Sequence, residues 1–199
     1  PGFAQPQVQM MAMPGQVAVA PVVAARFGRS ILELGGNNAM IVTPSADLEL
    51  ALRAIAFSAV GTAGQRCTSL RRLFVHRTTY DTLLPRLRAT FSGLPIGDPR
   101  LSSTLIGPLI DGQSYEAMQH ALTQAKTAGG QITGGQRVTE ETLGEGYYVA
   151  PAIVELPEQT DSVRTETFAP ILYVMPYDTL DEAIALNNDV PQGLSSCIF

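Results

Sequence analysis

The sequence has few of the residues that define several common protein classes. Its 199 residues include no tryptophan and only two cysteines, Cys67 and Cys197. Two cysteines without a CxxC spacing do not make the disulfide framework of a small secreted domain. The only histidines are His76 and His120, so the ligand set of a zinc site is missing. We therefore expect a cytoplasmic protein that binds no metal.

Positive charge and long apolar runs are also scarce. Lys and Arg number 13 against 18 Asp and Glu, which gives a net charge of −5 and a pI near 5.0. Because nucleic-acid binding depends on clustered basic residues, we expect no nucleic-acid partner. No apolar run reaches the roughly eighteen residues of a membrane span, and the first residues lack the charged region and long apolar core of a signal peptide. We expect no membrane partner.

What the chain does contain is the residue pattern of a layered domain. It is 45% hydrophobic, which suffices for one core. Short apolar runs alternate with helical periodicity, and this alternation predicts an α/β fold with a mostly parallel sheet. The predicted strands are 31–32, 39–42, 73–75, 147–156, 171–175 and 195–199, and the predicted helices are 47–63, 79–92, 114–128 and 180–188.

Capping and breaking residues mark the ends of two predicted helices. Ser45 or Asp47 can cap the helix over 47–63, and Gly61 and Gly64 can end it. Pro85 lowers the stability of the helix over 79–92 unless that helix begins late. Residues 1–22 are rich in Pro, Gln and Met and show no clean period, so we predict no structure there.

Cys67 is the first candidate for chemistry. It lies in the polar segment Gly64-Gln65-Arg66-Cys67-Thr68-Ser69. A cysteine is a strong nucleophile as the thiolate, and a glycine-rich loop beside an arginine suits an accessible thiolate. Most free cysteines, however, are inert buried residues, and local sequence alone favours that alternative.

Two glutamates are the further candidates. Glu33 lies between Leu32 and Leu34, where desolvation would suit a general base, although a strand-end carboxylate that points to water is an equal alternative. Glu166 precedes Phe168 in Glu166-Thr167-Phe168-Ala169-Pro170, and such a carboxylate can bind ribose hydroxyls. Local sequence alone favours an ordinary surface loop for Glu166.

Together the three segments resemble the signature motifs of the aldehyde dehydrogenase superfamily. The motifs occur in the family's order, with 34 positions from Glu33 to Cys67 and 99 from Cys67 to Glu166. Arg66, the run Leu-Gly-Gly-Asn-Asn at 34–38 and the run Gly-Leu-Ser-Ser at 193–196 look most like the α-aminoadipic semialdehyde dehydrogenase (antiquitin) branch, which works in lysine degradation. The resemblance assigns 23–199 to the catalytic domain and makes 1–22 a remnant or altered end of the cofactor domain.

The resemblance implies a role for each matching residue. Cys67 would attack the aldehyde, with its own backbone N–H as one oxyanion donor, and Glu33 would activate the water that hydrolyses the thioester. The implied cofactor is NAD, or alternatively NADP. Its ribose would bind Glu166, and its nicotinamide would lie near Phe168 and the Leu34 carbonyl.

For Arg66, the resemblance implies that it holds the polar end of the substrate. That substrate is a small-molecule aldehyde such as α-aminoadipic semialdehyde, with another semialdehyde or a betaine-type aldehyde as an alternative. Full-length relatives are homo-oligomeric. Cys197 matches no catalytic position, so we expect it in the core, and we assign no site role to His76 or His120.

Other features of the family have no counterpart in this sequence. The resemblance implies a Rossmann-type cofactor domain, an oxyanion asparagine and an oligomerisation hairpin, and none of these is found. We therefore expect no NAD-dependent turnover from the isolated chain, to be checked by NADH formation. The alternative function is that of an inactive, truncated fragment that acts as a binding or assembly module. A cysteine hydrolase of another fold is a weaker alternative, because no Cys/His motif is present.

Overall fold

The computed structural model describes residues 8–11, 25, 30–140 and 143–199. Its strands are β1 (Val8–Met11), β2 (Ser30–Glu33), β3 (Asn38–Val42), β4 (Leu70–His76), β5 (Gln131–Thr133), β6 (Ala152–Glu155), β7 (Ile171–Tyr177) and β8 (Ser196–Ile198). Its helices are α2 (Leu48–Val60), η2 (Gly61–Gly64), α3 (Arg77–Ser92), α4 (Gly112–Thr127), α5 (Asp161–Arg164) and α6 (Leu180–Asn188).

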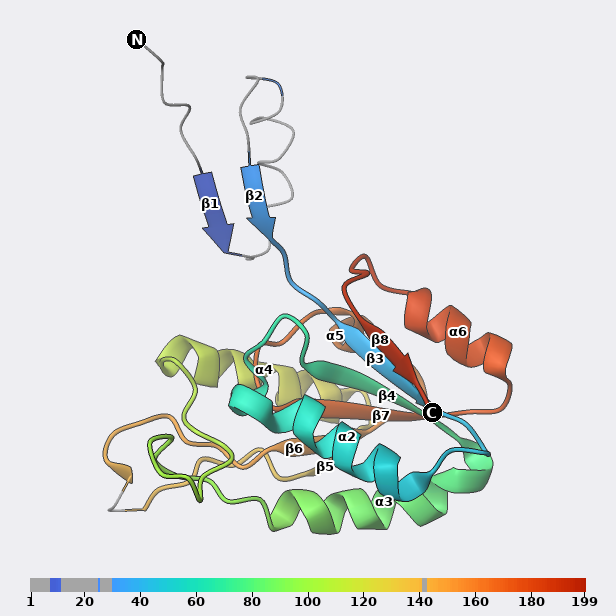
Figure 1. The fold of residues 1–199 in the computed structure, drawn as a ribbon, viewed down its shortest axis with the longest axis horizontal. Helices are drawn as coiled ribbons and strands as arrows, with labels where there is room; N and C mark the ends of the chain where they lie inside the picture. The colour runs from blue at the N-terminus through green and yellow to red at the C-terminus, as the bar shows by residue number, and fades with distance from the viewer. Residues whose placement is uncertain (1–7, 12–24, 26–29, 141–142) are drawn as a thin grey trace.

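Six of the strands form one sheet in the order β5-β6-β7-β4-β3-β8 (Figure 1). Every neighbouring pair is parallel except β5 with β6. β1 and β2 form a separate parallel pair, in register from Val8 opposite Ser30 to Met11 opposite Glu33. The described part of the chain therefore has the predicted α/β fold with a mostly parallel sheet.

The central strands are buried on both faces, as a parallel sheet between helices requires. β3, β4 and β7 are buried along almost their whole length. α2 and α3 contact each other and lie across one face of the sheet (Figure 1). Their buried stripes include Ile55 and Leu87, both with no exposed surface. This core holds the strands in fixed register, so the segments that precede them are fixed as well.

The helix ends agree with the capping signals, with one correction. Asp47 caps α2 by accepting hydrogen bonds from two backbone N–H groups of its first turn, and Gly61 ends it. α3 begins at Arg77, earlier than predicted, because His76 accepts from the Thr78 N–H and caps it. Pro85 therefore lies well inside α3 rather than near its start.

The strand predictions near the sheet edges need larger corrections. The predicted strand 147–156 is shortened to β6, since Pro151 cannot donate a ladder hydrogen bond, and only isolated bridges involve Tyr147 and Val149. The short elements β5 and α5 were not predicted, because three- or four-residue elements show no measurable period.

The chain ends hold two further departures from the sequence predictions. Cys197, expected in the core, is exposed because β8 is an edge strand. Val8–Met11 forms β1, where no structure was predicted, and the rest of 1–22 lies outside the described residues. None of the helices in the described ranges is both long and apolar enough to cross a membrane.

Candidate active site

The candidate site lies at the amino-terminal edge of the parallel sheet. Residues 34–37 lead into β3, 65–69 into β4, 165–170 into β7 and 193–195 into β8. Because these strands are parallel neighbours, the segments that enter them meet at one edge. In this respect the site differs from most ligand sites of open α/β sheets, which lie at the opposite, carboxyl edge. The register of the sheet thus brings the sequence motifs together.

A left-handed turn delivers the chain from α2 to the cysteine. Thr62, Ala63 and Gly64 have φ values of 56°, 52° and 66°. Residues with a side chain rarely adopt this conformation, so Thr62 and Ala63 mark a strained backbone. Such strain often occurs at functional sites. At Gly64 a Cβ atom would lie 2.5 Å from the Ala169 carbonyl oxygen, so only glycine fits.

Cys67 itself is in a tight turn that spans Arg66 to Ser69. The Ser69 N–H donates to the Arg66 carbonyl at 3.0 Å, and the Arg66 N–H donates to the Ser69 hydroxyl at 3.1 Å. These reciprocal bonds close the turn at both ends. Cys67 is half-buried, so its thiol is neither fully in the core nor freely exposed.

Asn38 fixes this turn from the neighbouring strand. Its buried amide nitrogen donates to the Cys67 carbonyl at 2.7 Å and to the Ser69 carbonyl at 2.8 Å. Its amide oxygen accepts from the Ser195 N–H at 3.2 Å. One side chain therefore ties the cysteine turn to β3 and to the segment before β8.

The glycine pair after Glu33 lets the three motif segments approach one another. A Cβ atom on Gly35 would lie 2.0 Å from a carboxylate oxygen of Glu166. A Cβ atom on Gly36 would lie 2.3 Å from the Cys67 carbonyl oxygen. A side chain at Gly36 would push the two segments apart, and one at Gly35 would displace the Glu166 carboxylate. The Glu33, Cys67 and Glu166 motifs thus meet at this pair of glycines.

Arg71 joins the cysteine turn to the Glu166 segment. Its guanidinium donates to the carbonyls of Gly64, Arg66 and Ala169, and it forms an ion pair with Glu166 at 3.4 Å. Burial lowers the pKa of Arg71, while Glu166, Tyr173 and Cys67 oppose that shift. The side chain is 2% exposed, so this charge is held inside the protein.

Three of the predicted site residues leave part of their surface open. Leu34 is 40% exposed and Phe168 is 46% exposed, on segments that meet at Gly35. Arg66 is exposed, donates from Nε to the Thr62 hydroxyl at 2.7 Å and lies 5.9 Å from the centre of the Phe57 ring. Exposed apolar side chains on the segments that hold the Glu166 carboxylate suit a ligand with flat and polar parts.

Five of the six predicted site residues have described side chains, and Glu33 does not. The backbone of Glu33 ends β2, while its side chain lies outside the described residues. For this motif, only the glycines that follow Glu33 are located against the other two motifs, at Gly35 and Gly36. Its role stays a prediction.

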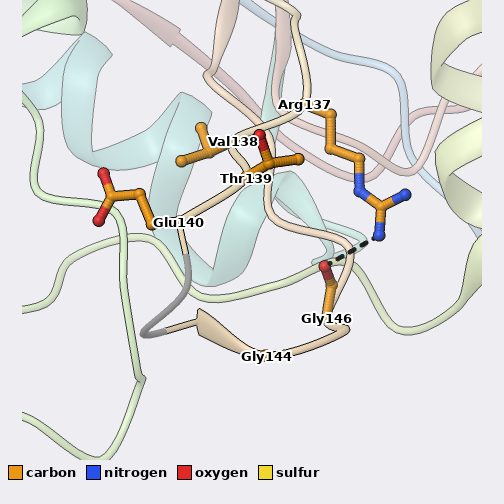
Figure 2. Close-up of a pocket in the computed structure, with 6 residues that line it drawn as sticks. All are labelled: Arg137, Val138, Thr139, Glu140, Gly144 and Gly146. Atoms are coloured by element: carbon orange, nitrogen blue, oxygen red, sulfur yellow. Dashed lines mark hydrogen bonds between the residues drawn. The ribbon is translucent and has the colours of Figure 1, made fainter.

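A separate hollow lies in the segment between β5 and β6 (Figure 2). Its volume is about 270 Å³, and Arg137 on its wall donates to the Gly146 carbonyl at 3.5 Å. Its other lining residues are Val138, Thr139, Glu140 and Gly144. None of these belongs to the three motifs, so we do not place the candidate site there.

Asn38 and Arg71 were not predicted as site residues. A signal for Arg71 was present, because Arg71 and Arg72 interrupt the apolar strand Leu70–Val75. Charged residues in a buried strand require partners, and such partners often lie at a functional site. Asn38 gave no comparable signal, since an asparagine after a glycine pair is typical of a turn.

Comparisons with known proteins identify the family of this chain. A sequence profile of the aldehyde dehydrogenase family matches residues 3–199. The chain belongs to the aldehyde dehydrogenase family. It is 49% identical over 181 residues to aldehyde dehydrogenase family 7 member A1 of Pisum sativum, covering 91% of this chain and 35% of that protein. It is 47% identical over 182 residues to α-aminoadipic semialdehyde dehydrogenase of Bos taurus, covering 91% and 33%.

Solved structures share the fold as well. Lactaldehyde dehydrogenase of Escherichia coli superposes with a TM-score of 0.89 at 32% identity, over 97% of this chain and 40% of that one. Betaine aldehyde dehydrogenase of Staphylococcus aureus, solved in complex with NAD+, gives a TM-score of 0.91 at 26% identity, over 97% and 39%. The chain spans about a third of the length of the curated relatives cited above.

Proposed function

We propose that this chain carries the catalytic cysteine of an NAD(P)-dependent aldehyde dehydrogenase that oxidises a semialdehyde, such as α-aminoadipic semialdehyde, to the carboxylate. Membership of the family supports the reaction class, and the name of the bovine relative supports the substrate class. The observation that carries the proposal is the meeting of three motif segments at Gly35 and Gly36. A role in lysine degradation follows from the same substrate.

In the proposed reaction Cys67 is the nucleophile. Its thiolate adds to the aldehyde carbon, and the oxygen that becomes negative is stabilised by the Cys67 backbone N–H. The resulting thiohemiacetal loses a hydride and becomes a thioester. Water, deprotonated by Glu33, then attacks the thioester, and the carboxylate leaves as the thiolate re-forms.

The cofactor would accept that hydride, and the residues present fit it. Glu166 offers a carboxylate that is 18% exposed and is oriented by Arg71, which suits the ribose hydroxyls. Leu34 and Phe168 offer exposed apolar surface for the flat nicotinamide. NAD is proposed first, because the Staphylococcus aureus structure contains it, and NADP remains an alternative.

Arg66 is proposed to bind the polar end of the semialdehyde. Its bond to Thr62 and its position near Phe57 hold the side chain beside the cysteine turn. A guanidinium is suited to a carboxylate because its N–H groups form a fixed fork. Arg66 would therefore select a charged semialdehyde over an uncharged aldehyde.

Protection of Cys67 from alkylation tests the proposal without requiring turnover. Iodoacetamide labelling of Cys67 and Cys197 is followed by mass spectrometry, with and without α-aminoadipic semialdehyde. We expect the semialdehyde to slow labelling of Cys67 and not of Cys197, because only Cys67 forms the thiohemiacetal.

Arg66→Gln is the matched variant for the substrate assignment. It should lower protection by the semialdehyde about tenfold and leave protection by propionaldehyde unchanged, since only the charged substrate loses a partner. Equal labelling of the two cysteines, unaffected by either aldehyde, would contradict the proposed nucleophile. An unchanged response in Arg66→Gln would contradict only the role of Arg66.

A further inference from the structure

Arg71 makes contacts that have no role in the proposed reaction. Its guanidinium lies 2.6 Å from the Gly64 carbonyl oxygen, 3.1 Å from that of Ala169 and 3.2 Å from that of Arg66. Glu166 is the fourth acceptor. Three of these acceptors are backbone groups, so Arg71 fixes the path of the main chain itself.

One of these carbonyls belongs to the peptide that enters Cys67. The Arg66 carbonyl accepts from Arg71 and from the Ser69 N–H, so two donors hold it. The other end of the same peptide is the Cys67 N–H, which is the proposed oxyanion donor. A cation on the carbonyl polarises the peptide and strengthens its N–H as a donor, and it also fixes the direction of that N–H.

The remaining contacts connect this peptide to the proposed cofactor segment. Arg71 binds both Ala169 and Glu166, and its guanidinium carbon lies 5.3 Å from the centre of the Phe168 ring. The Gly64 contact holds the left-handed turn against the same segment. One buried side chain therefore sets the position of the nucleophile turn relative to Glu166.

We infer that Arg71 is a positioning residue, which orients and polarises the Arg66–Cys67 peptide so that the Cys67 N–H can stabilise an oxyanion. This inference rests on the proposed function, because it assumes that Cys67 is the nucleophile. It adds a residue that acts through the backbone and touches neither the substrate nor the cofactor.

Two reactions of the same thiol separate this role from a general structural one. With p-nitrophenyl acetate, the Cys67 thiolate bonds to the acyl carbon, and p-nitrophenolate leaves with the electrons of the C–O bond. That acylation passes through an oxyanion, whereas alkylation by iodoacetamide displaces iodide and does not. The ratio of the two rates therefore reports on the oxyanion donor and cancels changes in exposure or thiolate content.

The experiment uses the full chain with Cys197→Ser, so that Cys67 is the only thiol. In Arg71→Gln we expect the acylation-to-alkylation ratio to fall about tenfold, less than the roughly 10²–10³ for loss of an oxyanion donor itself, because the donor is still present but no longer oriented. Arg71→Lys keeps the charge but lacks the forked N–H groups of a guanidinium, so its ratio should lie between those of the parent chain and Arg71→Gln. Arg72→Gln is the control, since Arg72 is equally buried but contacts none of these carbonyls.

Circular dichroism would verify that each variant is folded, and Arg71→Lys provides the test if Arg71→Gln is not. Ratios within twofold of the parent in the folded Arg71 variants would overturn the inference and leave the proposed function intact. An equal fall in Arg72→Gln would overturn it too. A parent chain that p-nitrophenyl acetate fails to acylate at Cys67 would instead overturn the proposed nucleophile.

Discussion

Arg71 and Arg72 are consecutive residues of β4, and both are almost fully buried, at 2% and 1% exposed. Successive side chains of a strand point to opposite faces, so the two arginines serve different regions. Arg71 binds the loops that enter β4 and β7. Arg72 binds the Asn37 carbonyl and the carbonyls of Leu186 and Asn187, which end α6.

The difference between the two regions is one of strain and regularity. On the Arg72 side, a cation meets the carbonyl end of a helix, which is a stabilising arrangement found in ordinary scaffolds. Burial lowers the pKa of Arg72 to about 10, and Asp189 opposes that shift. On the Arg71 side, a cation holds a left-handed turn and a loop around a half-buried cysteine. The contacts of Arg72 therefore stabilise the fold, whereas those of Arg71 fix the candidate site.

The largest expected effect is on the scaffold side. Arg72→Gln would remove the Arg72 donor from the carbonyls of Asn37 and Asn187 and one of several donors from the Leu186 carbonyl, so the free energy of unfolding should fall by about 3 kcal/mol. Urea denaturation followed by circular dichroism measures it.

Arg77→Gln is the matched control for Arg72→Gln. It removes an ion pair with Asp178 in which both side chains are 61% exposed, and such pairs contribute little. Equal losses in the two variants would break the comparison, because burial would then not be what makes Arg72 important.

An intermediate effect is expected at the glycine pair. In Gly36→Ala the new methyl would overlap the Cys67 carbonyl, a backbone atom that cannot rotate away, so the protein should lose about 2 kcal/mol of stability. Thermal unfolding and Cys67 acylation should both be impaired.

Gly35→Ala is the paired variant for this position. Its methyl meets the end of the Glu166 side chain, which can move. The loss of stability in Gly35→Ala should therefore be less than half of that in Gly36→Ala. A Gly35→Ala variant that is as unstable as Gly36→Ala would show that Glu166 is held as rigidly as the backbone.

The smallest effect is an expected gain. Thr62 is exposed with φ at 56°, so Thr62→Gly relieves a left-handed strain of about 1–2 kcal/mol. Against this stand an entropic cost of about 0.5–1 kcal/mol and the loss of one exposed hydrogen bond from Arg66, so the net gain is small. Calorimetry should show a slightly higher melting temperature. Thr123→Gly, in the regular helix α4, should lower it instead. A destabilised Thr62→Gly would mean that the site side stores no strain at this turn.

Much of the fold could be predicted because its signals are local. Helix α6 matches the prediction at both ends, and Asp47 caps α2 as expected. The errors lie where local sequence is a poor guide. Helix α3 begins early because the His76 side chain accepts from the Thr78 N–H, and Cys197 is exposed because β8 pairs with β3 alone among the described strands. The exposure of Cys197 depends on the order of strands in the sheet and cannot be read from its flanking residues. The His76 cap is local, but histidine is not one of the usual capping residues Ser, Thr, Asp and Asn.

The site divides in the same way. The sequence by itself determined the family and predicted the reactive groups, because Cys67, Glu166 and the glycine pair occur in a recognisable order and spacing. Only the tertiary structure decided that Asn38 holds the cysteine turn and that Arg71 joins this turn to the Glu166 segment, since these contacts span 29 and 98 positions in the chain. The physical reason is that a parallel sheet brings distant segments to one edge. Buried donors at that edge need acceptors, and the register of the strands decides which carbonyls lie within reach.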